Sequence, residues 1–455
     1  MPTETLPRLT IPEPSLPPEP LLRPEPSLPE VHSSVGISGS HVPWRRLLGF
    51  LGPGFLISVG YMDPGNWATD IAGGSQFGYT LLFVIMASNL VAVLLQSLSL
   101  KLGVATERDL AQLCHEQYGK RISFFLWLGA EVAIAACDLA EVIGSAIALN
   151  LLFHIPLFYG VLITGLDVLL ILMLQRWGFR WIEALVIALI ATIIVMFSVQ
   201  LILSRPDYAA AFGSLFLPST QIVTNPAMLY IAIGILGATV MPHNLYLHSS
   251  IVQSRKYKRT SEGKREAIFM ANVDSALALT VALFVNAAIL VVAAAVFHRS
   301  GHFEVAAIQD AYKLLSPLVG AAGASTLFAI ALLASGQNSS ITGTLAGQVV
   351  MEGFVNIKVA PWLRRMITRT LAIIPTIIVV AFTGERGTEK LLILSQVILS
   401  MQLSFAVVPL VIFTGNRKVM GEFVNARWLQ ALSWFVAALI AGLNAWLLVL
   451  MMKGN

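Results

Sequence analysis

Charged side chains are scarce in this sequence. Of its 455 residues only 12% are Asp, Glu, Lys or Arg, whereas 56% are hydrophobic. A soluble protein of this length cannot bury so much apolar surface, so the composition excludes the ordinary soluble classes and indicates a membrane protein with several spans. The formal net charge of +4 comes from basic residues in loops between apolar runs, and we expect no nucleic-acid partner.

Cysteine and the common secretory signals are also nearly absent. The two cysteines, Cys114 and Cys137, are interpreted as free thiols, which excludes a disulfide framework and a zinc knuckle. No positively charged start followed by an apolar stretch opens the sequence, so no signal peptide is predicted. The one glycosylation sequon, Asn338-Ser339-Ser340, falls inside a predicted span, so nothing indicates a glycosylated cell-surface protein.

Residues 1–43 differ in composition from the rest of the chain. They are rich in Pro, Glu and Ser and have too few apolar residues to form a core. Segments of this kind stay extended and solvated. We therefore predict a disordered, Pro-rich cytoplasmic tail over 1–43 that makes no packed contacts, followed by a transmembrane domain over 44–455.

Apolar runs long enough to cross a bilayer recur throughout the second part, and they predict an all-α membrane protein with about eleven transmembrane helices. The predicted spans are 47–72, 79–101, 122–152, 157–175, 180–204, 228–255, 271–297, 317–347, 366–384, 390–414 and 428–452.

Lysine and arginine are divided unevenly between the two sides of these spans. With the N-terminus in the cytoplasm, the cytoplasmic segments contain roughly twenty Lys and Arg residues and the outer segments roughly six. This asymmetry follows the positive-inside rule with an odd number of spans, and it puts the C-terminus outside. The short outer loops favour a bacterial inner membrane as the location.

A polar sequence, Gly60-Tyr61-Met62-Asp63-Pro64-Gly65-Asn66, interrupts the first span. Placing a charged residue at mid-membrane depth costs about 2.5 kcal/mol or more, so the presence of Asp63 indicates a functional role. Because Pro64 removes a backbone donor, we expect the helix to break and its freed carbonyls to point into a protein cavity. One anion, one amide and unwound carbonyls form a cation site; the alternative is a kinked helix with a buried, hydrogen-bonded Asp63.

The sixth span has a similar interruption, Ala238-Thr239-Val240-Met241-Pro242-His243-Asn244. Spans one and six are five spans apart, so they run in opposite directions through the membrane. Two broken helices in corresponding positions of inverted halves indicate a transporter site at the membrane midplane. We therefore predict two inverted five-helix repeats, about 47–204 and 228–414, with an extra helix at 428–452.

The two breaks together offer a mixed set of metal ligands. Asp63 supplies a charged oxygen, Asn66 a neutral one and Met241 a thioether sulfur, and the carbonyls of Gly60 and Ala238 lie just before the breaks. Mg²⁺ and Ca²⁺ prefer all-oxygen ligands, whereas a thioether favours softer metals. The set predicts binding of Mn²⁺ or Fe²⁺, and also of Cd²⁺, although a methionine in a span can instead be core packing.

Asp63-Pro64-Gly65-Asn66 together with Met241-Pro242-His243-Asn244 resembles the natural-resistance-associated macrophage protein (NRAMP) family of proton-coupled divalent metal transporters, and the likeness extends from about Trp44 to the last span. The resemblance implies the leucine-transporter-like fold and import of Mn²⁺ or Fe²⁺ with protons by alternating access. It implies that Asp63, Asn66 and Met241 bind the metal, with the carbonyls of Gly60 and Ala238, and Gln396 in Leu394-Ser395-Gln396-Val397, joining in some states. Many members have Ala where this chain has Gly60, which leaves a carbonyl ligand in place.

Three acidic residues, Glu131, Asp138 and Glu141, occupy span three. Steps of seven and ten residues keep them within about 80° on a helix. Buried acids on one stripe are typical of a proton relay, although single members can pair with buried basic groups. His243 titrates near neutral pH, so it either links metal binding to proton release or holds the helix break. We expect Asp63 to be protonated or hydrogen-bonded when empty and to lose its proton as a metal ion approaches.

The resemblance implies a proton exit route that also includes three arginines. Arg255 ends span six, and Arg364 and Arg365 lie at the start of span nine. By resemblance they act with Asp138 and Glu141. Ordinary inside-positive anchoring is the alternative for the pair in span nine.

Other function classes fit less well. An amino-acid or other small-cation symporter on the same fold would bind a carboxylate and an amine, which Met241 beside Asp63 does not favour. An enzyme is not expected, because no His-Glu-x-x-His motif occurs and His243 and His248 do not share a helix face. A channel would not need two broken helices. We expect a monomer in the lipid bilayer whose metal is the substrate, with no resident cofactor.

Overall fold

The computed structural model describes residues 26–29, 31–37, 43–166, 177–305, 307–321, 323–355, 361–383 and 385–452, which are almost entirely helical. The longer helices are α3 (Pro64–Phe77), α4 (Leu82–Thr106), α6 (Lys120–Phe153), α9 (Phe179–Ser204), α12 (Pro226–Val240), α13 (Pro242–Ile251), α14 (Ser261–Val296), α15 (Ile308–Val319), α16 (Ala324–Val355), α17 (Pro361–Thr383), α18 (Glu385–Gly415) and α20 (Arg427–Met452). The short helices are α1 (Pro43–Phe50), α2 (Pro53–Ser58), η1 (Gly60–Met62), α5 (Leu110–Gln117), α7 (Leu157–Thr164), α10 (Tyr208–Ser214), α11 (Gln221–Thr224), η2 (Val252–Ser254), η3 (His298–Ser300), α19 (Arg417–Met420) and η4 (Gly421–Phe423). The strands β1 (Val35–Gly36) and β2 (Arg255–Lys256) pair in parallel.

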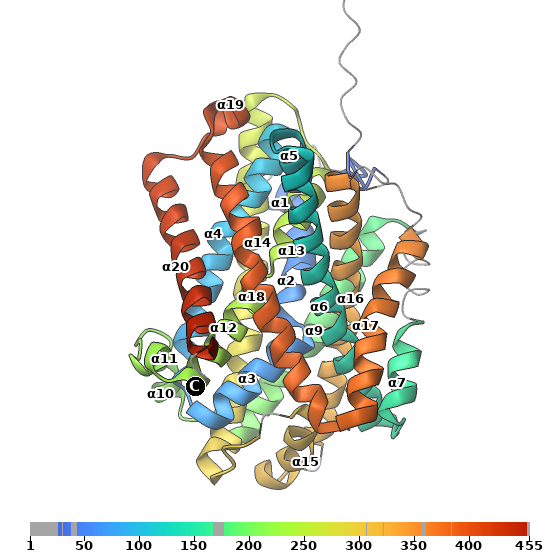
Figure 1. Ribbon diagram of the computed structural model, residues 1–455, viewed down its shortest axis with the longest axis vertical. Helices are drawn as coiled ribbons and strands as arrows, with labels where there is room; N and C mark the ends of the chain where they lie inside the picture. The colour runs from blue at the N-terminus through green and yellow to red at the C-terminus, as the bar shows by residue number, and fades with distance from the viewer. Residues whose placement is uncertain are drawn as a thin grey trace, which may run out of the picture.

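The predicted spans coincide with helices of the bundle. Within the described residues, seven helical segments are long and apolar enough to cross a membrane. The other predicted spans correspond to the broken pair α2 and α3 and to α7, α16 and α17. The second half of the predicted span 157–175 lies outside the described residues. Figure 1 shows these helices side by side along the long axis of the molecule.

Both predicted helix breaks are present, each directly before its proline. The first span consists of α2, the single 3₁₀ turn η1, an extended residue at Asp63 and then α3, which begins at Pro64. The sixth span consists of α12 and α13, separated by Met241 with φ 40° and ψ 109°. Proline is tolerated at the first position of a helix but not in its interior, so Pro64 and Pro242 each start a new segment.

Glycines let the other helices approach these breaks closely. A Cβ on Gly144 of α6 would collide with the ring of Pro64, so α6 lies directly behind the first break. A Cβ on Gly237 of α12 would collide with the backbone oxygen of Gln396 in α18. Small residues permit such close contacts between membrane helices. The two breaks are thus enclosed by α6 and α18, which also contact each other.

Residues 26–29 and 31–37 differ from the predicted tail. The exposed fractions of Leu28, Val31 and Val35 are 1%, 7% and 6%, and β1 pairs with β2 at the end of span six. The predicted absence of packed contacts is wrong for this segment, because three apolar side chains in a short interval are enough to dock it. Residues 1–25, which contain most of the prolines, lie outside the described residues, and their disorder stays a prediction.

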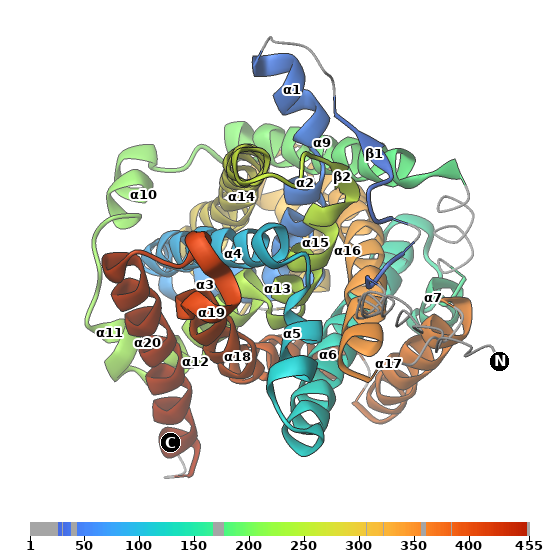
Figure 2. The ribbon, with the colours of Figure 1, turned by 90° about the horizontal axis from the view of Figure 1, so that it is seen from above.

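The two ends of the helical bundle are distinct. The strands β1 and β2 and helices α1, α5 and α19 gather at one end, which faces the viewer in Figure 2. The other end contains α15, and α20 finishes near it in Figure 1. An odd number of spans requires this arrangement, since the first and last spans then start at the same side.

Candidate metal site

The two helix breaks meet at the centre of the bundle. A Cβ on Gly60 would lie 3.0 Å from Sδ of Met241 and would collide with the amide of Asn244. Asp63, Met241 and Ala238 are fully buried, and Asn66 is 2% exposed. The structure therefore brings together the residues that the sequence predicted from two segments far apart in the chain.

Several side-chain oxygens at this point have no hydrogen-bond partner among the described residues. They include Oδ2 of Asp63, Oδ1 of Asn66, Oδ1 of Asn244 and Oε1 of Gln396. The other carboxylate oxygen of Asp63 accepts a hydrogen bond from the backbone N–H of Asn66 at 2.8 Å. Buried polar atoms are nearly always paired, so several unpaired acceptors in one place indicate a site for a cation or for water.

The candidate carbonyl ligands follow from the positions of the prolines. In an α-helix the carbonyl of residue i accepts from the N–H of residue i+4. Pro64 and Pro242 have no N–H, so the carbonyls of Gly60 and Ala238 cannot receive that bond. The backbone itself thus frees two oxygens next to Asp63 and Met241.

Gln396 reaches the first break from α18. A Cβ on Gly65 would collide with its amide, so the side chain lies against the start of α3. Its Nε2 donates to Oγ of Ser395 at 3.1 Å. That bond orients the amide and leaves Oε1 as the acceptor available to a ligand.

Met241 has surroundings of two kinds. Its sulfur lies 3.6 Å from Nδ2 of Asn244 and close to Gly60. The rest of the side chain packs with Ala133, Cys137 and Leu399 in a small buried cluster. The sulfur thus lies beside the first break, while the rest of the side chain contributes to core packing.

Polar side chains from other helices also hold the unwound backbone of the first break. Asn286 donates to the carbonyl of Tyr61 at 2.7 Å, and Oγ of Ser335 donates to the carbonyl of Met62. The indole N–H of Trp67 donates to the same carbonyl at 3.2 Å. These bonds satisfy two freed carbonyls in place of water. Asn286 and Ser335 stand out in the sequence only as polar residues in apolar spans.

Two of the three acids of span three lie together behind the site. A Cβ on Gly343 of α16 would be 3.1 Å from Oδ1 of Asp138 and 3.1 Å from Oε1 of Glu141. Oε1 of Glu141 also accepts from Ser339 at 2.9 Å. Glu131 lies apart, partly exposed, and accepts from the indole of Trp127 on its own helix at 3.1 Å.

The histidines of span six have different surroundings. His243 is fully buried, and neither ring nitrogen has a hydrogen-bond partner among the described residues. His248 is also buried, and its Nδ1 lies 2.8 Å from Oε1 of Gln96. Gln96 in turn donates to the hydroxyl of Tyr61 at 2.6 Å, which ties His248 to the first break.

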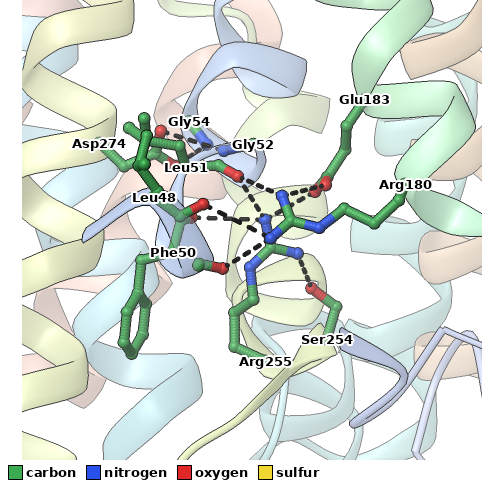
Figure 3. Close-up of polar contacts among 11 residues, drawn as sticks. Leu48, Phe50, Leu51, Gly52, Gly54, Arg180, Glu183, Ser254, Arg255 and Asp274 are labelled. Atoms are coloured by element: carbon green, nitrogen blue, oxygen red, sulfur yellow. Dashed lines mark hydrogen bonds and ion pairs between the residues drawn. The ribbon is translucent and has the colours of Figure 1, made fainter. Parts of the chain in front are cut away.

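Arg255 belongs to a separate network at the β1–β2 end of the bundle (Figure 3). It is fully buried, and its Nη2 lies 2.8 Å from Oε1 of Glu183 and 2.8 Å from the carbonyl of Leu51. Arg180 also contacts Leu51 and Glu183, at 3.0 and 3.2 Å. Asp274 completes the network by accepting from the N–H groups at the start of α2.

The carboxylate of Asp274 holds the start of α2. It accepts hydrogen bonds from the backbone N–H of Gly52 at 3.2 Å and from that of Gly54 at 2.6 Å. Gly52 has φ 140°, and a Cβ there would collide with Glu183 and Arg255. Arg255 therefore binds the backbone at the start of α2. The contacts described here do not join it to Asp138 or Glu141, with which it was expected to act, and its part in a proton route stays a prediction. The side chains of Arg364 and Arg365, at the start of α17, lie outside the described residues.

Asp70 is a further buried acid that the sequence analysis did not select. It is 1% exposed on α3, and its Oδ2 has no hydrogen-bond partner among the described residues. Asp70, like Glu183 and Asp274, could have been selected from the sequence, because each is an acidic residue inside a predicted apolar span. Within the described residues no group of three or more His, Cys, Asp and Glu side chains could hold a metal ion, so a cation at the breaks depends on the mixed ligand set.

Comparison of the sequence with known proteins finds one family and relatives that share one name. The sequence pattern of the family described as natural resistance-associated macrophage protein-like (Nramp) matches residues 54–450. The "Divalent metal cation transporter MntH" of Nostoc sp. is 62% identical over 423 residues, covering 93% of this chain and 96% of that protein. The protein of the same name from Listeria innocua is 62% identical over 422 residues, covering 93% and 94%.

Solved structures of two transporters also superpose on the chain. The manganese transporter of Eremococcus coleocola superposes with a TM-score of 0.86 at 43% identity, covering 92% of this chain and 90% of that one. The nucleobase-cation-symport-1 transporter Mhp1 gives a TM-score of 0.58 at 16% identity, covering 88% and 91%, which shows a shared fold. The predicted fold class is confirmed by these two superpositions.

Proposed function

Because the chain belongs to the natural resistance-associated macrophage protein-like family, we propose that it is a secondary importer of divalent transition-metal ions that couples their movement to protons. The substrate class is Mn²⁺ and Fe²⁺, and Cd²⁺ is also accepted. The observation that carries the proposal is the group of unpaired acceptor oxygens where the two helix breaks meet.

The metal is held by groups from both breaks. Asp63 supplies the one full negative charge, Asn66 and Gln396 supply amide oxygens, and Met241 supplies a thioether. The carbonyls of Gly60 and Ala238 complete the shell in different conformations. Since the ligands come from the two inverted halves, movement of one half relative to the other changes the shell and exposes the site to alternate sides.

Proton release follows from the one carboxylate among the proposed ligands, that of Asp63. A divalent cation next to Asp63 stabilises its ionised form, so binding expels a proton from it. The proton leaves through His243 or through Asp138 and Glu141, which lie on the helix directly behind Pro64. Metal and proton need not share one path.

The protein is an integral membrane protein. We place it in a bacterial inner membrane as a monomer, with the N-terminus in the cytoplasm and the C-terminus outside. The distribution of Lys and Arg supports this orientation. The end of the bundle that contains β1 and β2 then faces the cytoplasm.

Uptake into proteoliposomes tests the function. Asp63→Asn keeps the size of the side chain and removes its charge, so we expect no Mn²⁺ uptake from a variant that still folds. Asp207→Asn, at the exposed N-cap of α10, is the control and should transport normally. Near-normal uptake by Asp63→Asn would reject the site.

An amino-acid or small-cation symporter on the same fold is the second candidate, since Mhp1 shares the fold. Metal-dependent stabilisation separates the two. Mn²⁺ should raise the melting temperature of the wild-type protein and not that of Asp63→Asn, because a ligand that binds only the folded state stabilises it. Stabilisation by amino acids and not by metals would favour the second candidate.

A further inference from the structure

The segment 26–29 and 31–37, here named the N-terminal strap, lies across the β1–β2 end of the bundle (Figure 2). Its apolar side chains Leu28, Val31 and Val35 point inward and are almost completely buried. Burying side chains of this size contributes about 1.5–3 kcal/mol each before the loss of chain entropy is subtracted. Such a segment docks on the bundle in a specific way.

Polar contacts tie the strap to three parts of the bundle. The N–H of Leu28 donates to Oε2 of Glu352 at 2.9 Å, near the end of α16. The N–H of Ser33 donates to the carbonyl of Gln253 at 3.0 Å, in η2. Arg259, in the loop after β2, lies 3.4 Å from Oγ of Ser33. The strap therefore connects span six to span eight across their ends.

The strap also touches the residue that holds the first span. Val35 pairs with Arg255 through the backbone. The guanidinium of Arg255 in turn lies 2.8 Å from the carbonyl of Leu51, immediately before α2 (Figure 3). A single residue thus links the strap to the start of α2, which leads to the first helix break and Asp63.

On its other side the strap is less tightly packed. A cavity of about 340 Å³ lies between Val31 and Val35 of the strap and the segment from Trp177 to Ile182 at the start of α9. Space beside a docked segment lets it lift away without first displacing a helix.

We propose that the N-terminal strap is an autoinhibitory latch: while docked it holds α2, through Arg255, in the position described above, and it must detach before the metal site opens to the cytoplasm. The proposal rests on the proposed transport function and names a regulation of the same site.

A reversible cross-link tests the latch. Gly36 and Lys256 are partners in the β1–β2 register and both are exposed. Neighbouring strands lie about 4.8 Å apart, within the range a disulfide can bridge. We therefore expect the full-length double variant Gly36→Cys and Lys256→Cys to form a disulfide on oxidation. Oxidation should lower Mn²⁺ uptake about tenfold or more, which corresponds to about 1.4 kcal/mol, and reductant should restore it.

The single variants Gly36→Cys and Lys256→Cys are the matched controls and should not respond to oxidant. Uptake by the reduced double variant tests the transport function separately from the latch. A cross-linked protein that transports at the rate of the reduced one would overturn the proposal, because the strap would then stay docked throughout the cycle.

Truncation gives an independent measurement. Removal of residues 1–24 leaves the strap intact and should leave the uptake rate unchanged. Removal of residues 1–37 deletes the latch and should raise the initial rate severalfold, about two- to tenfold if inward opening limits turnover. Equal rates for the two truncations would contradict the proposal; if the longer truncation fails to reach the membrane, the cross-link decides.

Discussion

At the scale of single residues, the site depends on which atoms lack partners. Asp63, Asn66 and Gln396 each present one acceptor oxygen that nothing in the described protein satisfies. Leaving such groups buried and unpaired costs about 1–3 kcal/mol each. Three of them within one group of residues are difficult to explain by folding alone and easy to explain by a cation that binds there.

Met241 is the residue whose replacement tests selectivity. In Met241→Ala a water oxygen can take the place of the sulfur, so the site becomes all oxygen and Ca²⁺ is penalised less. We expect Cd²⁺ to lose affinity, some Mn²⁺ uptake to remain, and Ca²⁺ or Mg²⁺ to be accepted, with a change of about 1–3 kcal/mol in relative affinity. Competition of each ion against Mn²⁺ measures this.

Met228, a buried methionine on α12, the helix that ends directly before Met241, provides the comparison. Met228→Ala removes the same number of atoms from the interior without touching the helix breaks. If Met241→Ala weakened all ions equally, as expected for Met228→Ala, the role of Met241 would be packing.

At the scale of elements, α6 both packs against the first helix break and carries the two neighbouring acids of the stripe. Gly144 gives room for Pro64, and the two turns before it carry Asp138 and Glu141. The break in span one and the acidic stripe are therefore parts of one contact between two helices, and a change in packing there should affect both metal binding and proton movement.

Gly144→Ala tests the packing. Its Cβ would collide with the ring of Pro64, and overpacking of a tight contact costs about 1–3 kcal/mol. We expect a lower melting temperature in detergent and slower Mn²⁺ uptake. The matched control is Gly442→Ala on α20, where a Cβ meets nothing within 4 Å; it should be neutral or slightly stabilising, since Ala is favoured over Gly in helices by up to about 1 kcal/mol. Equal melting temperatures for the two variants would contradict the close contact.

The acidic stripe is tested by proton flux. Asp138→Asn and Glu141→Gln should reduce metal-driven proton movement more than metal binding, because they remove titratable groups without touching the ligands. Glu262→Gln is the control, since Glu262 is exposed in the first turn of α14 and is not part of the stripe. A pH-sensitive dye inside liposomes reports the flux. Unchanged flux in both Asp138→Asn and Glu141→Gln would remove the stripe from the proton path.

At the scale of the whole molecule, the Arg255 network joins elements that are distant in the chain. Arg255 at the end of span six contacts the start of α2 and Glu183 of α9, and Asp274 of α14 binds the same end of α2. Breaking a buried ion pair by removing one partner costs about 3–5 kcal/mol. The network is therefore a major constraint on how the first span moves.

Glu183→Gln should lower the stability of the folded protein by about 3 kcal/mol, at the low end of the range for a broken buried pair because the amide still accepts one hydrogen bond. Glu422→Gln is the control: its pair with Arg265 is 40% and 68% exposed, so a loss of at most about 1 kcal/mol is expected. Thermal unfolding in detergent compares the two, and similar melting temperatures would mean that the buried pair adds little.

The sequence was sufficient to predict the spans, the two breaks and the residues around them, because prolines and polar residues in apolar runs have local causes. Contacts that depend on packing could not be predicted in this way. Arg255 was assigned to a proton route by resemblance, whereas its contacts lie with Glu183 and Leu51. The strap was missed because three apolar residues among prolines give no periodic signal, and only their packing against the helical bundle explains them.

The presence of one carboxylate in the proposed ligand set has an electrical consequence. If Asp63 is neutral when the carrier is empty and ionised when a divalent ion is bound, the ion and its ligands together hold one net positive charge and the empty ligand set holds none. Moving one charge across the whole membrane is worth about 2.3 kcal/mol per 100 mV. An inside-negative voltage would therefore favour the inward passage of the loaded carrier and leave the return of the empty one unaffected, so the current carried by the protein should depend on voltage mainly in the loaded direction.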